Sequence, residues 1–505
     1  MGVGLSLLWK APEVNPTTGK ARSIPVLNPV DMHGRVFAFS WLGLMLSFWA
    51  WYTFPPLLTV TIKQDLHLST AQIANSNILS LCAALFLRFA AGPLCDQFGP
   101  RRVYATLMLL GCLTVGLAPL VNNITGLYIS RSFIGVLGAT FVPCQVWCTV
   151  FFDKNVVGTA NALAGGWGTA GVGIAYLVMP AVFDSLVSRQ RMSESQAWRV
   201  TFVAPLLCLA VCALGMLLLC PDAPAGSRQA GVRRVQDIAG ANGPHGVSVA
   251  GARGVMTGGA PPDEERGISS DEDAHASCQK HRAPAWRDIG TAVRLSFKDA
   301  LPVVLSLQTV FHVATYSCSA GGELAVSAVL ASYFKANYSS LGQTEASHLA
   351  SISGFLNFAA RPLGGAVADV LYNWFGRKLW LKKAWITCCG VTAGALLIAI
   401  GRVNPSEQKG QSVGTMVGLV SVAAMFLEAG SGANFALVPH VHPSANGIVS
   451  GLTGGCGNLG GIVFATVFRF TSGGAGYCTA FSVIGAVQIA LNLAVSGIAP
   501  LPPGQ

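Results

Sequence analysis

The sequence is poor in charged residues. Only 11% of its 505 residues are Asp, Glu, Lys or Arg, whereas about a quarter of the residues in an average soluble protein are charged. Hydrophobic residues make up 52% of the chain, and apolar runs of about 20 residues recur along it, each long enough to cross a hydrocarbon core of about 30 Å. The scarcity of charge therefore excludes an ordinary soluble protein and indicates a protein with many membrane spans.

The signatures of several common functions are also missing. The net charge of +10 could suit nucleic acid, but the Lys and Arg residues lie mainly in short connecting segments and one long loop, without the interleaved aromatic residues of a nucleic-acid patch. Most of the 14 cysteines lie inside apolar runs without zinc-type spacing. Cys144 and Cys148 are one helical turn apart and could hold a metal, although helix packing explains them more simply. With no phosphate loop or nucleophile motif, we expect no cofactor, no metal, no nucleic-acid partner and no enzymatic activity.

The polar segments predict how the chain is oriented. Residues 1–34 lack the short apolar core and small-residue cleavage site of a signal peptide, so we expect the first membrane span to direct insertion. Basic residues follow the second and eighth expected spans, and the positive-inside rule places these loops in the cytoplasm. The expected location is the plasma membrane, with both termini cytoplasmic. The basic residues that set this orientation are Arg101, Arg102, Arg377, Lys378, Lys382 and Lys383.

The apolar runs predict about twelve spans. They begin near residues 36, 71, 103, 127, 157, 198, 300, 346, 384, 412, 444 and 477. Between the sixth and seventh lies a long break rich in Gly, Ser, Pro and charge, which cannot bury enough apolar surface to order itself. The expected organisation is a cytoplasmic segment over residues 1–34, a six-helix half over 35–220, a disordered cytoplasmic loop over 221–297 and a second six-helix half over 298–500.

The two halves repeat each other. Residues 88–96 read RFAAGPLCD and residues 361–369 read RPLGGAVAD, so each presents Arg, then Gly four residues later, then Asp after another four. This resembles the parallel-repeat plan of major facilitator transporters, whose substrate sites lie near the midplane between the halves. We therefore expect an all-α membrane protein with twelve transmembrane helices in two six-helix halves.

A second repeat consists of glycines in the fifth and eleventh spans. Glycines at these spacings let helix backbones approach closely in lipid, and the residues alone leave open whether that surface is static packing or slides between moving halves. Gly158, Gly165, Gly166, Gly168 and Gly171 correspond in turn to Gly447, Gly454, Gly455, Gly457 and Gly460.

Arg88 and Arg361 carry the strongest functional signal. Arg88 lies eight residues before Asp96, so at about 1.5 Å per residue it is roughly 12 Å deeper than the cytoplasmic edge of its helix, and Arg361 matches it in the other half. A charged side chain at this depth usually faces a cavity and marks a substrate path. The alternative is an ion pair within one half, for which neither helix supplies a carboxylate within one turn. Two guanidiniums converging on one cavity suit a small, flat oxyanion.

The segment GPLCDQFGPRR, which ends the second span, resembles the loop motif of major facilitator proteins, and the second half echoes it. Its acidic residues can pair with basic groups at the cytoplasmic end and latch the inward-closed state. The expected gating residues are Asp96, Arg101, Arg102, Asp369 and Arg377.

The paired arginines and the glycine-rich segments AGGWGTAGVG (164–173) and GLTGGCGNLGG (451–461) resemble the nitrate/nitrite porter family, and the long central loop is similar to that of fungal high-affinity nitrate transporters. The resemblance covers nearly all of the membrane region. In that family the two arginines hold the anion, two aromatic rings sandwich it, and tyrosine and asparagine side chains complete the site. The corresponding residues here are Arg88, Arg361, Phe48, Phe141, Tyr316 and Asn458.

The sequence departs from the family pattern at two positions in the fifth span. Thr169 replaces the usual Asn, and Val172 replaces a glycine. Threonine can still donate one hydrogen bond to a substrate, but it lacks the reach of an amide. For Phe48 and Phe141, ordinary core packing is the better explanation without the family.

The resemblance implies a secondary active transporter that moves nitrate or nitrite by alternating access. In the empty site the two arginines are expected to repel each other until an anion bridges them. A transporter of another small anion, such as a monocarboxylate, and a non-transporting sensor that signals through the long loop are the alternatives. Glu323 and Glu428 are acids within spans, and Glu323 is the better candidate for carrying a coupled proton, although a helix-to-helix hydrogen bond explains it equally well. The expected partners are nitrate or nitrite, protons and the lipid bilayer.

Overall fold

The computed structural model describes residues 5–16, 18–153, 155–224, 297–376, 378–403, 412–442, 446–471 and 476–501. Most of the expected central loop and the expected gating residue Arg377 lie outside this part of the chain. The described residues are almost entirely helical, apart from isolated bridges that join Val14 to Ala21 and Ala21 to Phe152. The all-α prediction is confirmed.

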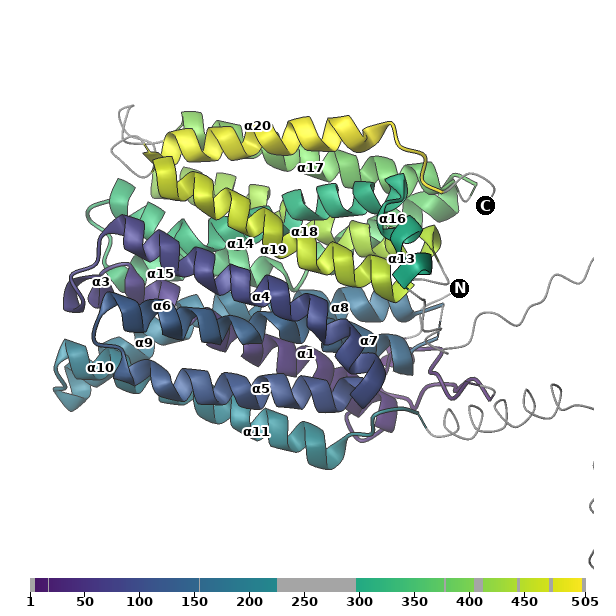
Figure 1. Cartoon of the computed structure of the whole chain (residues 1–505), viewed down its shortest axis with the longest axis horizontal. Coiled ribbons are helices and arrows are strands. Elements are labelled where there is room, and N and C mark those ends of the chain that lie inside the picture. Colours follow the sequence, from purple (N-terminus) through teal and green to yellow (C-terminus); the bar gives the residue numbers. More distant parts are fainter. Residues whose placement is uncertain are drawn as a thin grey trace, which may run out of the picture.

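The first half contains six spans, several of them built from two consecutive helices (Figure 1). The spans are α1 (Met32–Trp51) with the short α2 (Phe54–Leu58); α4 (Thr70–Phe98); α5 (Pro100–Leu117); α6 (Ile124–Ile134) continued by η3 (Gly135–Thr140) and α7 (Phe141–Phe151); α8 (Val157–Thr169) with α9 (Gly171–Gln190); and α10 (Glu194–Thr201) with α11 (Val203–Leu219). The short α3 (Thr61–Asp65) lies between the first two spans.

The second half adds six more spans. They are α14 (Leu307–Asn337), preceded by the short α13 (Phe297–Val304); α15 (Gln343–Leu356) followed by α16 (Ala360–Trp374); α17 (Leu379–Arg402); α18 (Val413–Val441); α19 (Asn446–Thr471); and α20 (Gly476–Ser496). The predicted span starts agree closely with these helices. The largest difference, seven residues, is at α14, which was expected near residue 300 and begins at Leu307, although the short α13 before it begins at Phe297.

Ten of these spans, among the described residues, are long and apolar enough by composition to cross a membrane. The other two are α14 and the α15–α16 pair, which lie alongside the rest in the bundle (Figure 1). Both carry polar residues in their middle, including Glu323 and Arg361, and polar residues lower the mean hydropathy of a segment. Hydropathy still detects α4 and α18, although they carry Arg88 and Glu428.

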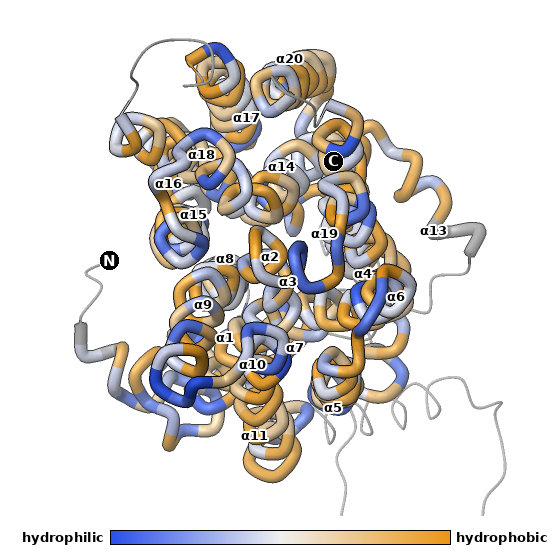
Figure 2. The backbone as a smooth tube through the Cα atoms, turned by 90° about the vertical axis from the view of Figure 1, so that its left-hand side faces the viewer, coloured by the Kyte–Doolittle hydropathy of each residue, from blue (hydrophilic) through white to orange (hydrophobic). Residues whose placement is uncertain are grey.

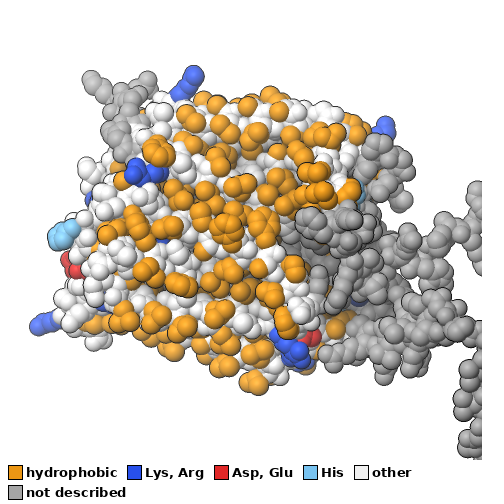
Figure 3. Space-filling view, viewed as in Figure 1, with side chains coloured by type: hydrophobic (Ala, Val, Ile, Leu, Met, Phe, Trp, Pro, Cys, Tyr) orange, Lys and Arg blue, Asp and Glu red, His pale blue; other side chains and the backbone are white. Residues whose placement is uncertain are grey.

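The bundle has an apolar side surface and two polar ends. Figure 2 looks along the spans and shows α14, α17, α18 and α20 on one side and α1, α5, α7 and α11 on the other. On the face drawn in Figure 3, hydrophobic side chains cover the long sides, and charged side chains gather toward the two ends. We call the end that carries Arg101 the inner end and the end that carries α3 and α10 the outer end.

Gly99 makes the sharp turn between the second and third spans. Its φ is +90°, a conformation that residues with a Cβ rarely adopt. Pro100 then occupies the first position of α5, where its missing N–H is not needed. This turn brings Arg101 and Arg102 to the inner end.

Hydrogen bonds join the two halves on the outer side of the bundle. The side-chain oxygen of Gln343, at the start of α15, accepts from the backbone N–H groups of Val60 at 3.0 Å and Thr61 at 2.9 Å. Tyr52 donates to the carbonyl of Leu324 at 3.3 Å. At the rim, Arg469 donates to the side chain of Asn75 across the same boundary. The structure is therefore closed at its outer end.

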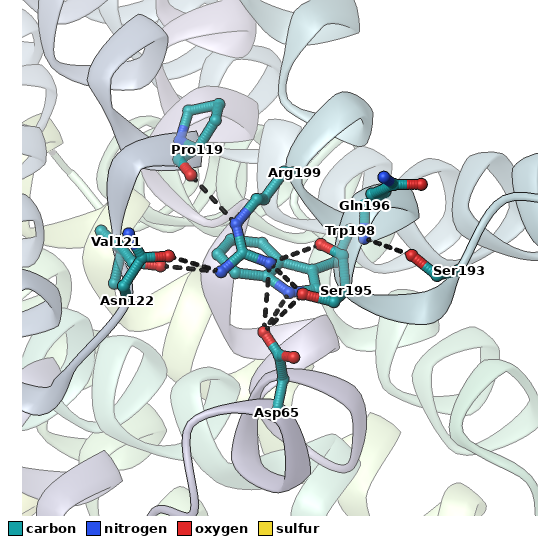
Figure 4. Close-up of polar contacts among 9 residues, drawn as sticks. All are labelled: Asp65, Pro119, Val121, Asn122, Ser193, Ser195, Gln196, Trp198 and Arg199. Atoms are coloured by element: carbon teal, nitrogen blue, oxygen red, sulfur yellow. Dashed lines mark hydrogen bonds and ion pairs between the residues drawn. The ribbon is translucent and has the colours of Figure 1, made fainter.

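A cluster around Arg199 ties together three outer connections of the first half (Figure 4). Arg199, on α10, donates to the carbonyls of Pro119 and Val121 at 3.0 and 3.1 Å. It forms an ion pair of 3.2 Å with Asp65 at the end of α3, and its guanidinium lies 4.3 Å from the centroid of the Trp198 ring. The Trp198 indole also donates to Asp65 at 2.9 Å. One arginine thus fixes α3 and α10 to the connection between α5 and α6.

We expect Arg199→Ala to lower the free energy of unfolding by about 2 kcal/mol, because it removes the donor to the carbonyls of Pro119 and Val121 and the cation that pairs with Asp65. Burial raises the pKa of Asp65, but hydrogen bonds from Trp198 and Ser195 and the charge of Arg199 outweigh burial and lower it below its ordinary value. The contribution of the ion pair should therefore persist from neutral pH down to about pH 4 and disappear as the pH falls through the lowered pKa.

Thermal unfolding of the purified protein in detergent, followed by tryptophan fluorescence, measures this effect. Arg189→Ala is the matched control, because Arg189 is exposed at the same end of the bundle. Equal melting temperatures for the Arg199 and Arg189 variants would contradict the prediction.

Candidate anion site between the two halves

Arg88 lies on α4 with only 4% of its surface exposed. Its Nε donates to the carbonyl of Gly138 at 2.9 Å, and its Nη1 donates to the carbonyl of Gly454 on α19 of the other half at 2.7 Å. Its Cζ lies 5.2 Å from the centroid of the Phe141 ring. Arg88 is therefore held at the boundary between the halves with an aromatic ring beside its charge.

Arg361 lies at the start of α16, just after the break that separates this helix from α15, and is 5% exposed. Its Nη2 is 3.4 Å from Oε2 of Glu323 on α14, and its Nε has no hydrogen-bond partner among the described residues. The Tyr316 hydroxyl also interacts with Arg361. Both predicted arginines are thus buried at the boundary between the halves, close enough for their charges to interact.

The ion pair of Arg361 corrects one sequence-based inference. No carboxylate lies within a turn of Arg361 on its own helix, which argued against an ion pair within one half. The partner, Glu323, comes instead from α14, 38 positions away in the sequence. Its negative charge offsets that of Arg361, so the expected repulsion between the two arginines in the empty site is weaker than the sequence suggested.

The two expected aromatic residues lie in different surroundings. Phe141 faces Arg88, and its ring also meets Phe435 of α18 edge-on at 5.9 Å. Phe48 is buried on α1, and its ring contacts Trp51 at 5.3 Å. Of these two phenylalanines, only Phe141 lies at cation–π distance from an arginine. The predicted role of Phe48 therefore has no support from an arginine contact among the described residues, whereas that of Phe141 has one.

Phe435 was missed by sequence reasoning. Its ring meets the rings of Phe141 and Tyr316 edge-on, at 5.9 and 5.2 Å, and so joins the two halves on the inner side of the arginines. Gly432, one turn before it, presses against the backbone of Arg361, where an added Cβ would lie 1.9 Å from the Arg361 carbonyl oxygen. The sequence shows only a glycine followed by a phenylalanine one helical turn later, and this spacing does not by itself indicate a binding site.

Asn458, on α19, is fully buried, and neither atom of its side-chain amide has a hydrogen-bond partner among the described residues. An unpartnered amide is costly in a dry interior. The neighbouring Gly457 packs against the Tyr316 ring, where an added Cβ would lie 2.8 Å from a ring carbon. Asn458 therefore offers both a donor and an acceptor, one residue after the glycine that meets Tyr316.

Thr169 belongs to a different part of the site than expected. Its hydroxyl lies 2.8 Å from the side-chain oxygen of Asn357, and also within hydrogen-bond distance of the carbonyls of Gly165 and Gly166 in its own helix. Asn357 in turn donates to Glu323 at 2.8 Å and to Glu428 at 3.1 Å. Thr169 thus contacts a buried acidic network behind Arg361. Sequence reasoning missed Asn357, which lies in the break between α15 and α16.

Comparisons with known proteins agree with this architecture. Residues 40–465 match the family model described as Major Facilitator Superfamily. The chain is 31% identical to a protein named "High affinity nitrate transporter 2.7" from Arabidopsis thaliana, over 87% of this chain and 78% of that protein.

The chain belongs to the nitrate/nitrite porter family of the major facilitator superfamily.

This transporter is a multi-pass membrane protein and not an enzyme. It is also 31% identical, over 99% of both chains, to a protein from Elsinoe fawcettii named "Elsinochrome transporter 1". Among solved structures, a D-xylose–proton symporter superposes with a TM-score of 0.60 at 12% identity, covering 91% of this chain and 96% of that one. At that identity the likeness shows the fold alone. The name of the Elsinoe protein indicates that overall similarity does not specify the cargo.

Three of the expected gating residues, Arg101, Arg102 and Asp369, form ion pairs in the described part of the transporter. Arg101 and Arg102 both contact the carboxylate of Asp222, at 3.7 and 3.5 Å. In the second half, Asp369 pairs with Lys382 at 2.7 Å. Arg101 and Arg102 on α5 thus pair with a residue just after α11, and Asp369 on α16 pairs with a residue on α17, so each pair lies within one half. Asp96 lies on α4, but its side chain is outside the described part of the chain, so its pairing stays a prediction, as does that of Arg377.

Proposed function

We propose that this transporter moves nitrate and nitrite across the plasma membrane by alternating access, with the anion held between Arg88 and Arg361. The observation that carries the proposal is the pair of buried guanidiniums at repeat-related positions, one in each half. A charged side chain at this depth is costly unless a ligand or an opposite charge compensates its charge. Arg88 makes its hydrogen bonds to backbone carbonyls, so within the described part of the chain its positive charge has no carboxylate at ion-pair distance.

The surroundings of the arginines favour a small planar anion. A guanidinium is a flat fork that donates two parallel hydrogen bonds to a planar oxyanion. The Phe141 ring beside Arg88 offers a flat face, and the buried amide of Asn458 offers further hydrogen bonding. Bulky rings of Tyr316, Phe141 and Phe435 meet edge-on around this space, which restricts the size of the cargo.

The two halves supply the parts that alternating access requires. Each arginine belongs to a different half, so an anion that binds both draws the halves together. The hydrogen bonds of Gln343 and Tyr52 close the outer side, and Phe435 lies on the inner side of the arginines. A complete cycle must break the outer contacts and separate Phe435 from Phe141 at different times.

Uptake by the purified protein in sealed vesicles tests the proposal. Nitrate, nitrite and formate are compared, with and without an inward pH gradient, against vesicles that lack the protein. We expect nitrate and nitrite to enter faster than formate. Formate uptake at an equal or higher rate would favour the monocarboxylate alternative, and no anion uptake above the protein-free control would contradict transport altogether.

A further inference from the structure

Two buried carboxyl groups lie behind Arg361 and share one amide. The side-chain nitrogen of Asn357 donates to Oε1 of Glu323 at 2.8 Å and to Oε1 of Glu428 at 3.1 Å. Glu323 is 9% exposed and Glu428 only 1%. The amide oxygen of Asn357 faces the Thr169 hydroxyl, so the amide nitrogen, with its two protons, faces the two acids. The carboxyl groups are therefore close neighbours in a dry environment.

The two acids differ in how their charge is compensated. Glu323 has Arg361 at 3.4 Å. Glu428 has no cation at ion-pair distance among the described residues, and its Oε2 is buried without a hydrogen-bond partner. Two ionised carboxylates side by side with one nearby cation repel each other, and a buried carboxylate without a partner is strongly disfavoured. A proton on Glu428 removes both penalties.

The two carboxyl groups face a small cavity that is separate from the anion site. Glu323 and Glu428 line it together with Ser327 and Ser353, and the rest of its wall is mainly apolar. Val420, near the outer start of α18, is also part of the wall. The cavity therefore extends from the acids toward the outer end, inside the second half, and neither arginine lines it.

We propose that Glu323 and Glu428 form one proton-binding site, with Glu428 as the residue that holds the proton, and that this proton sets the affinity of Arg361 for the transported anion. The inference rests on the proposed anion site. When both carboxylates are ionised, their charge offsets that of Arg361 and repels an entering anion. When a proton binds an oxygen of Glu428, forming an O–H bond, one negative charge disappears and the anion binds more tightly.

The other ionisable groups around the pair do not titrate in the same pH range. Tyr316 on α14 interacts with Glu323. Tyr52, just after α1, donates to the carbonyl of Leu324, and Tyr176 on α9 donates to the carbonyl of Ser327. Arg88 and Arg361 are the nearby cations. Tyrosine and arginine side chains ordinarily have pKa values of about 10 or more. Among these tyrosine, arginine and carboxyl groups, the two carboxyl groups are therefore the candidates for proton binding.

Two further buried groups lie farther from the pair. Arg131, on α6, is held by the side chain of Asn77 at 2.7 Å and lies over the Phe54 ring. His312 is on α14, three turns toward the inner end from Glu323, and is paired with Asn434 at 2.6 Å. Neither belongs to the hydrogen-bonded network of Asn357.

Calorimetric titration of the purified full-length transporter with nitrate tests the inference. Repeating the titration in buffers with different ionisation enthalpies gives the number of protons taken up per anion bound. For the wild-type protein we expect uptake of about one proton, and an affinity that falls by up to about tenfold per pH unit as the pair ionises. Glu428→Gln should take up no proton and bind nitrate with nearly the same affinity from pH 5.5 to 8.

Glu345→Gln is the matched control, because Glu345 is on α15 of the same half but caps that helix at the outer end. It should behave like the wild-type protein. Wild-type nitrate binding without proton uptake, or a Glu428→Gln variant that keeps both proton uptake and pH dependence, would overturn the inference. The titration of the wild-type protein tests the inference even if the Glu428→Gln variant does not fold. Failure of the wild-type protein to bind nitrate or nitrite at any pH would instead overturn the proposed function.

Discussion

Replacing Arg88 or Arg361 with alanine should reduce nitrate and nitrite uptake by about 100-fold or more, because each variant loses a charged, forked donor from the anion site. Lysine should restore little at either position, since an ammonium is a point charge without the planar fork. The two alanine variants should differ in stability. Arg361→Ala leaves Glu323 as an unpaired buried charge, which typically costs about 3–5 kcal/mol, whereas Arg88→Ala leaves only the carbonyls of Gly138 and Gly454 without a donor.

Initial rates of uptake in vesicles, corrected for the amount of folded protein, measure the first effect, and thermal unfolding measures the second. Arg402→Ala is a suitable control, because Arg402 is exposed at the outer end of α17. Normal nitrate and nitrite uptake by a well-folded Arg361→Ala protein would rule out the two-arginine site.

Gly354→Ala should prevent the outer side from closing fully and slow uptake by at least about tenfold. Gly354 on α15 meets Gly173 on α9 at the boundary between the halves, and an added Cβ would lie 2.3 Å from the Gly173 backbone nitrogen. The neighbour is backbone, so one helix must move away, and such overpacking costs about 1–3 kcal/mol. That penalty falls only on the arrangement in which the two helices touch, so it shifts the population toward the outward-open state.

Hydrogen–deuterium exchange reports this shift. The segments around Val60 and Gln343, which are hydrogen-bonded to each other across the outer side, should exchange faster in the variant. Gly451→Ala is the control, because a Cβ at Gly451 meets nothing within 4 Å. If the Gly354 variant matched the control in both exchange and uptake, close approach at this contact would not be needed for the transport cycle.

The repeated glycines behave unequally in the structure, which the sequence alone did not reveal. A Cβ at Gly460 would lie 2.0 Å from the Ser317 carbonyl, inside the second half, whereas Gly158 has open space around it. Gly166 instead faces the other half, where a Cβ would lie 2.6 Å from the Asn357 carbonyl. These glycines therefore pack within one half at some positions and between the halves at others, and sliding of the surface between the halves stays a prediction.

The sequence by itself determined the class of protein, the number and approximate limits of the spans, and the repeat that pairs Arg88 with Arg361. These features are local or periodic: the thickness of the bilayer sets the length of each apolar run, and the repeat appears as identical spacing. Phe141, Tyr316 and Asn458 could be named only because a family resemblance supplied them.

Only the tertiary structure decided which polar groups meet in the middle of the bundle. The carboxylate that pairs with Arg361 is on another helix, and Asn357 links Glu323 to Glu428 across 34 and 71 positions of sequence. Spacing along one helix predicts neighbours three or four residues apart, but it does not predict which faces of three separate helices turn toward each other. Packing between helices sets those contacts, and it placed Thr169 on the acidic network behind Arg361.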